Sequence, residues 1–144
     1  YRGLLPTSYT MAPVPSDTYP NRTYEDAKVT GEIVIRYNKS SNSHSVTVIW
    51  YLRAVNPAHS QYVDQDFSLS GNISGPLPDF IEGTVDDPYS EKRFSIALNR
   101  DSNGGSYMGT VSINTPARLY GYMTNPPAPT YLTTLHEGVV LGRE

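Results

Sequence analysis

The stretch from residue 29 to residue 55 carries the pattern that most constrains the fold. Bulky and smaller side chains alternate in its first part, which places Ile33, Ile35 and Tyr37 on one face of an extended chain. After a polar loop at 38–44, the chain returns as a run of mostly β-branched and aromatic residues, which is typical of a strand. We therefore expect a two-stranded hairpin here, with the rest of the fold built around it.

The second strand of this hairpin has apolar side chains on both faces. Val46, Val48 and Trp50 share one face, while Ile49 and Tyr51 lie on the other. Apolar groups on both sides are typical of a strand in the centre of a sandwich or barrel. The residues that we expect in the core are Trp50, Val48, Ile35 and Phe94.

Period-two patterns recur along the chain, whereas no segment has the pattern of a helix of useful length. Alternating runs at 93–98 and 107–113 flank Asn103-Gly104, and this dipeptide is typical of a hairpin turn. Other strands are expected near residue 66, at 80–81, 117–123, 130–135 and 139–141. The sequence therefore predicts an all-β fold, a single antiparallel β-sandwich or barrel of about eight or nine short strands with little helix.

The first part of the chain differs from the rest because four prolines fall between residues 6 and 20. We expect residues 1–28 to form a Pro-rich linker or a strap across the sheet, and residues 29–144 to form the antiparallel β domain. The 144 residues suit one domain with its own core. The chain begins at Tyr1 and not at methionine, so we expect a fragment or a processed product.

Charge and composition exclude several classes of partner. Cysteine is absent, which excludes disulfides and thiolate metal sites. The 11 basic residues are scattered and the formal charge is -3, so nucleic acid is not expected as a partner. Membrane insertion is not expected either, because no run reaches the roughly 18 to 20 apolar residues that a spanning helix needs. The 12 tyrosines suit wet contacts with protein or sugar, or reflect strand propensity alone.

The pattern of reactive side chains favours a protein that is not an enzyme and needs no cofactor. The three histidines, at 44, 59 and 136, lack the spacing that places two on one metal ion. No nucleophile elbow, phosphate-binding glycine loop or zinc-hydrolase helix is present. The carboxylates that are weak candidates for Ca²⁺, or else simply solvated acids, are Asp64, Asp66, Asp86 and Asp87.

Binding residues are expected in loops, because turn formers and polar residues concentrate between the strands. The segments expected to be displayed are 38–44, 56–61, 71–79, 100–105 and 125–130. The candidate binding residues within or beside them are Asn38, Asn42, His44, His59, Asn72, Asp79, Asp101, Asn103 and Tyr131.

In length, composition and density of strands, the chain resembles the protruding domain of a small icosahedral RNA-virus capsid protein of the nodavirus or tombusvirus kind. The Pro-rich segment at 6–20, the low charge and the lack of a basic arm fit such a domain. The resemblance implies a non-enzymatic module on the virion surface that forms dimers or trimers. It also implies contact with a host-cell receptor, either a protein or a glycan.

The alternative is a carbohydrate-binding module or another extracellular β-sandwich adhesion domain. Sugar platforms need exposed planar rings, and Trp50, the single tryptophan, falls in a central strand. The tyrosines that could replace it are Tyr19, Tyr24, Tyr62, Tyr89 and Tyr131.

Overall fold

The structure, a computed structural model, describes residues 1–14, 23–54, 65–74, 77–89, 92–117 and 130–144. These residues form eight antiparallel strands and contain no helix, so no helix in the described residues could span a bilayer. The strands are β1 (Arg2–Val14), β2 (Thr23–Asn38), β3 (Ser43–Ala54), β4 (Gln65–Ser74), β5 (Phe80–Asp87), β6 (Lys92–Arg100), β7 (Ser106–Ala117) and β8 (Thr130–Gly142). The predicted all-β class is confirmed, although most strands are longer than expected.

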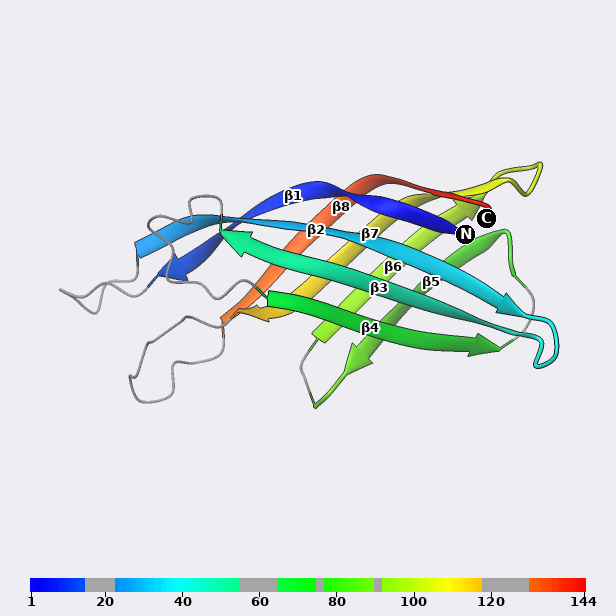
Figure 1. The fold of residues 1–144 in the computed structure, drawn as a ribbon, viewed down its shortest axis with the longest axis horizontal. Coiled ribbons are helices and arrows are strands. Elements are labelled where there is room, and N and C mark those ends of the chain that lie inside the picture. Colours follow the sequence, from blue (N-terminus) through cyan, green and yellow to red (C-terminus); the bar gives the residue numbers. More distant parts are fainter. Residues whose placement is uncertain (15–22, 55–64, 75–76, 90–91, 118–129) are drawn as a thin grey trace.

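All eight strands belong to one sheet with the order β4-β3-β2-β1-β8-β7-β6-β5. Strands β1 to β4 form one wall, and β5 to β8 cross them obliquely in the opposite wall (Figure 1). The first and last strands of the chain are neighbours in the middle of the order, while β4 and β5 are its two edges. The sheet therefore curls into a nearly closed barrel.

Two tight turns account for the hairpins that the sequence predicts. Asn42, with a φ of 46°, ends the turn between β2 and β3 in the left-handed region, which asparagine tolerates better than most residues. In the β6 to β7 hairpin, Gly104 has a φ of 72° and its amide donates to the carbonyl of Asp101 (2.8 Å). Asn103 has no positive φ, so the Asn-Gly pair does not form the two-residue turn that the sequence suggests.

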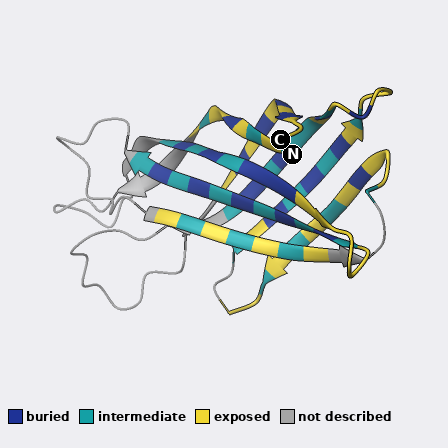
Figure 2. Ribbon diagram, turned by 45° about the vertical axis from the view of Figure 1, so that its right-hand side comes forward, coloured by how far each residue is buried: buried dark blue, intermediate teal, exposed yellow. Residues whose placement is uncertain are grey.

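Alternation along the strands fills the barrel interior. Figure 2 shows buried residues alternating with half-buried ones along β3, whereas Ile33, Val34 and Ile35 of β2 are buried in succession. Along the edge strand β4, half-buried residues alternate with exposed ones. The core consists of Leu5, Val29, Ile33, Ile35, Val46, Val48, Trp50, Leu52, Ile81, Phe94, Ile96, Leu98, Tyr107, Val111, Ile113, Val139 and Leu141. The predicted core positions of Trp50, Val48, Ile35 and Phe94 are thus confirmed. Burial of each large apolar side chain contributes about 1.5 to 3 kcal/mol.

The largest core residue depends on a glycine in the neighbouring strand. Trp50 is paired with Gly31 across β2 and β3, and its ring stacks on Phe67 of β4 with 5.5 Å between ring centroids. A Cβ at Gly31 would lie 2.1 Å from the carbonyl oxygen of Ile49, so only glycine allows the two backbones to approach this closely.

Part of the expected linker is a full member of the sheet, which corrects the prediction for residues 1–28. Pro6 is accommodated because the β1 to β2 register shifts between Leu5 and Ser8, which indicates a bulge. A residue in a bulge does not have to donate a backbone hydrogen bond to the neighbouring strand, so proline is tolerated there. Pro13 pairs with Tyr24 of β2, in a part of β1 that has no ladder to β8. Strand β4 also continues to Ser74, so the expected loop at 71–79 begins later than predicted.

The junction between β1 and β8 combines one ladder pair with buried polar contacts. Arg2 pairs with Gly142, and a Cβ at Gly3 would lie only 2.1 Å from the carbonyl oxygen of Val140. Further along β8, the buried His136 donates from Nδ1 to the Pro6 carbonyl (2.6 Å), because a carbonyl can only accept. Its Nε2 is 2.9 Å from the Thr134 hydroxyl, which can donate to it. Burial lowers the pKa of His136, and the bond to Pro6 opposes this effect.

The seam between β4 and β5 is held differently. The structure describes no ladder between these two edge strands. Instead the Val85 side chain packs against Gly71, where an added Cβ would lie 2.5 Å from a Val85 methyl carbon. The Lys92 ammonium group crosses the seam and donates to the Ser68 carbonyl (3.1 Å) at the protein surface.

Candidate functional site

One end of the barrel gathers most of the predicted binding residues. The β2 to β3 turn, the β6 to β7 turn, and the segment that leads into β5 all lie at this end, beside both chain termini (Figure 1). The candidate residues exposed here are Asn38, Asn42, Asn72, Asp79, Asp101 and Asn103. We call this group the turn end. The structure thus brings together residues that are far apart in the sequence.

Two tyrosines hold the turn end in place through hydrogen bonds to backbone carbonyl groups. The Tyr107 hydroxyl donates to the Pro78 carbonyl, and the Tyr1 hydroxyl donates to the Gly104 carbonyl, both at 2.6 Å. The two rings meet edge to face with 4.9 Å between centroids. Burial raises the pKa of Tyr107, so this hydroxyl stays protonated and keeps donating. These tyrosines therefore support the turns and do not serve as a contact surface.

The asparagines of the turn end use their side-chain oxygens to hold their own turns. Asn38 Oδ1 accepts from the Ser40 amide (3.0 Å), and Asn103 Oδ1 accepts from the Gly105 amide (2.8 Å). Asn42 Oδ1 accepts from the Tyr37 hydroxyl (2.8 Å). These three asparagines are exposed, as are Asp79 and Asp101 at the same end of the barrel. The turn end can therefore bind a partner through hydrogen bonds.

Of the three remaining predicted binding residues, the structure describes the side chain of His44 alone. His44 is buried because it is the first inward-facing residue of β3, in phase with Val46 and Val48, so its predicted display is wrong. His59 lies outside the described residues. Tyr131 belongs to β8, but its side chain is not among those described.

The calcium candidates have other roles where the structure describes them. Asp66 forms an ion pair with Arg53 (2.6 Å), and Asp86 forms one with Arg93 (3.1 Å). Asp87 accepts a hydrogen bond from the Tyr89 amide (3.1 Å) in the turn after β5. Asp64 lies outside the described residues. Within the described part of the chain, no three His, Asp or Glu residues are grouped as a metal site would require.

A second surface, which sequence reasoning missed, lies on the outer face of the barrel and runs across β1, β8 and β7. We call this part of the outer face the outer wall. Leu4, Val140 and Met108 lie on the adjacent strands β1, β8 and β7, with exposed fractions of 79%, 48% and 56%. Met108 and Val140 are ladder partners, and the neighbouring pair Arg2 and Gly142 brings Leu4 beside Val140. We call these three residues the apolar row. Adjacent exposed apolar side chains of this kind are typical of contact surfaces.

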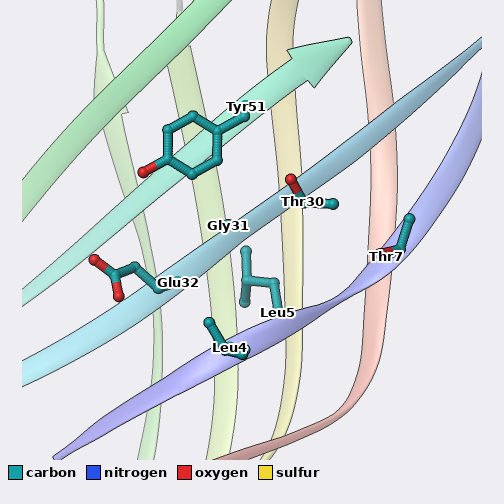
Figure 3. Close-up of a pocket in the computed structure, with 7 residues that line it drawn as sticks. All are labelled: Leu4, Leu5, Thr7, Thr30, Gly31, Glu32 and Tyr51. Atoms are coloured by element: carbon teal, nitrogen blue, oxygen red, sulfur yellow. The ribbon is translucent and has the colours of Figure 1, made fainter. Parts of the chain in front are cut away.

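A hollow of about 370 Å³ lies beside the apolar row. Figure 3 shows Leu4, Leu5 and Thr7 from β1, Thr30 and Glu32 from β2, and Tyr51 from β3 around it, and Gly31 completes the lining. The β1 bulge forms this hollow, because Pro6 and Thr7 stand opposite the single residue Thr30.

A weak signal for the outer face was present in the sequence. Ile49 and Tyr51 give β3 an apolar second face, which indicated a strand in the centre of the fold. In the structure both side chains are half-buried, and Tyr51 lines the hollow. The sequence did not indicate Leu4 as part of this surface, because Leu4 falls in the expected linker. No protein-family model, curated protein or solved structure matches the chain.

Proposed function

We propose that the chain is a non-enzymatic recognition and assembly module displayed on an exterior surface, acting as the protruding domain of a viral capsid protein. The observation that carries this proposal is the apolar row on the outer wall of a barrel whose interior is filled by side chains. A filled barrel leaves its outer surface for binding. The hydroxyl of Thr134 and the imidazole of His136 lie 2.9 Å apart, but both side chains are buried.

The apolar row suits contact with a second copy of the chain. Exposed charges of opposite sign border the row along the strands, with Arg2, which forms a surface ion pair with Glu144 (3.4 Å), on one side and Glu137 on the other. A two-fold axis along the row would set Arg2 of each copy against Glu137 of the other. Three apolar residues make a small interface, so the isolated domain should associate weakly. A shell would strengthen the contact by raising the local concentration.

The turn end suits assembly contacts. Tyr1 and Glu144 lie at this end, so a shell domain joined to either terminus would be close to it (Figure 1). The amide and carboxylate groups of Asn72, Asp79 and Asn103 would then hydrogen-bond with neighbouring subunits. The part of the outer face beside the apolar row would remain free for receptor contact.

Analytical ultracentrifugation over a range of protein concentrations tests this proposal. We expect the wild-type domain to show a concentration-dependent dimer, and Met108→Lys to remain a monomer. Leu135→Lys is the matched control, because Leu135 is 53% exposed and lies on the outer face of the same wall, away from the apolar row. Arg2→Glu should weaken the dimer, and the exchange Arg2→Glu with Glu137→Arg should restore it. A wild-type domain that stays monomeric at millimolar concentration would overturn the proposal.

A further inference from the structure

The hollow beside the apolar row contains polar groups that the protein itself does not use. The side chains of Thr7, Thr30, Glu32 and Tyr51 line it. Within the described residues, none of their hydroxyl or carboxylate oxygens takes part in a hydrogen bond or ion pair. Surface groups on regular strands often find such partners, as Thr47 does with Ser70 (2.8 Å) and Thr84 with Ser95 (2.8 Å). A ligand with hydroxyl groups would engage all four at once.

The rest of the lining is apolar. Leu4 and Leu5 contribute methyl groups, and Gly31 adds no side chain that would fill the space. The ring of Tyr51 stands at one side (Figure 3). An aromatic ring beside apolar groups suits the C–H face of a sugar ring, while the surrounding oxygens suit its hydroxyls. The volume of about 370 Å³ lies within the range of small-ligand sites.

The charges around the hollow select against anionic ligands. The guanidinium carbon of Arg53 lies 5.6 Å from the centre of the Tyr51 ring, so a cation already occupies the favourable position over this ring. Arg53 is itself ion-paired with Asp66 (2.6 Å), whereas the carboxylate of Glu32 lines the hollow and repels an anionic ligand. The hollow therefore disfavours an anion, and a neutral ligand can use its hydroxyl-binding groups.

We propose that the hollow binds a neutral hexopyranose unit of a glycan. Tyr51 and Leu4 contact the apolar face of the sugar, Glu32 accepts hydrogen bonds from two of its hydroxyls, and Thr7 and Thr30 bind at its edge. This inference names a site and a ligand class for the recognition role proposed above, but it does not depend on self-association.

Titration of the ¹⁵N-labelled domain, followed by amide chemical shifts, tests this inference. The probes are the methyl glycosides of glucose, galactose and mannose, with N-acetylneuraminic acid as the anionic probe and Nα-acetyl-lysine methylamide as the cationic probe. We expect saturable shifts at the amides of Thr30, Gly31 and Tyr51 with at least one methyl hexoside. The two charged probes should bind more weakly than that hexoside.

Substitutions in the hollow give the decisive comparison. Glu32→Ala and Tyr51→Ala should each weaken hexoside binding about tenfold. Both side chains face outwards, so the variants should keep the wild-type circular dichroism spectrum and melting temperature within a few degrees. The matched controls are Glu82→Ala and Tyr89→Ala, which remove an exposed carboxylate and an exposed ring away from the hollow and should bind as the wild type does.

Three results would overturn the inference: no saturable shift with any hexoside, equal binding by the Glu32 and Tyr51 variants, or preferential binding of a charged probe. Met108→Lys separates this inference from the proposed dimer, because Met108 does not line the hollow. Leu4 belongs to both surfaces, so a domain in which Met108→Lys abolishes the dimer yet binds the hexoside normally would show that hexoside binding does not require the dimer.

Discussion

The two walls of the barrel meet in two places, and these two closures are built on different principles. At the junction of β1 and β8, backbones approach closely at Gly3, and the buried His136 links the strands through the Pro6 carbonyl. At the seam of β4 and β5, a valine packs against Gly71, and one exposed lysine reaches across to Ser68. The junction lies in the middle of the strand order, whereas the seam joins its edges.

The difference shows that the contribution of a polar group to stability depends on its burial. When a buried hydrogen bond is lost, the remaining polar group has no water to bind instead, which costs about 1 to 3 kcal/mol. The same bond at the surface is replaced by water at little cost. We therefore expect the junction to behave as a rigid part of the fold and the seam to behave as an adaptable one.

The same substitution at each closure compares their rigidity. Gly3→Ala should destabilise the protein by about 3 kcal/mol, because the new Cβ meets a backbone oxygen that is fixed by the strand. Gly71→Ala should cost about 1 kcal/mol, since Val85 lies on an edge strand that can shift. Urea denaturation of both variants gives the two values. Equal losses would mean that the seam is as rigid as the junction.

Removing the imidazole from the junction tests its polar link. His136→Leu should cost about 2 kcal/mol, because the Pro6 carbonyl and the Thr134 hydroxyl each lose their partner inside the protein. Thermal unfolding at pH 8 measures the loss when His136 is neutral in the wild type. A melting temperature within one degree of the wild-type value would show that His136 only fills space.

Acid should weaken the junction before it affects the seam. The pKa of His136 is lower in the folded protein than its ordinary value near 6.5, so between these two values the unfolded chain binds more protons. The stability that His136 contributes is therefore complete above pH 6.5 and is lost as the pH falls through the folded pKa. Melting curves from pH 8 to pH 5 should show this loss in the wild type. The part of this pH dependence that His136 causes should be absent in His136→Leu.

The smallest effect is expected at the seam. Lys92→Met keeps most of the side chain's length and removes the ammonium group that donates to Ser68. We expect a loss of about 0.5 kcal/mol or less, because water replaces the exposed bond. Urea denaturation with Lys28→Met as the control measures the difference. A loss above 1.5 kcal/mol would place the seam in the same class as the junction.

The sequence predicted those parts of the fold that depend on local patterns. The strands that contain Trp50 and Phe94 follow from period-two alternation, and Gly104 marks the turn between β6 and β7. The position of β1 could not be predicted, because Pro6 and Pro13 normally oppose a strand. They are tolerated only because one lies at a bulge and the other faces no ladder on its second side.

The candidate surfaces show the same limit. Turn formers correctly indicated the exposure of Asn42 and Asp101, since the chemistry of a turn is local. His44 was misplaced because β3 begins at Ser43, two residues earlier than expected, so that His44 is a strand residue that points inwards. The apolar row and the hollow depend on the pairing of β1 with β8 and on a bulge, and neither can be deduced from patterns within one strand.

The pairing of Arg2 with Gly142 also bears on how fast the barrel forms. It joins residues separated by almost the whole chain, so closing that loop costs conformational entropy before the contact can stabilise the fold. A circular permutant that links the two termini through a few glycines, and opens the chain in the turn between Lys39 and Asn42, would make this pairing local. The native contacts would be unchanged, but the barrel should then fold faster.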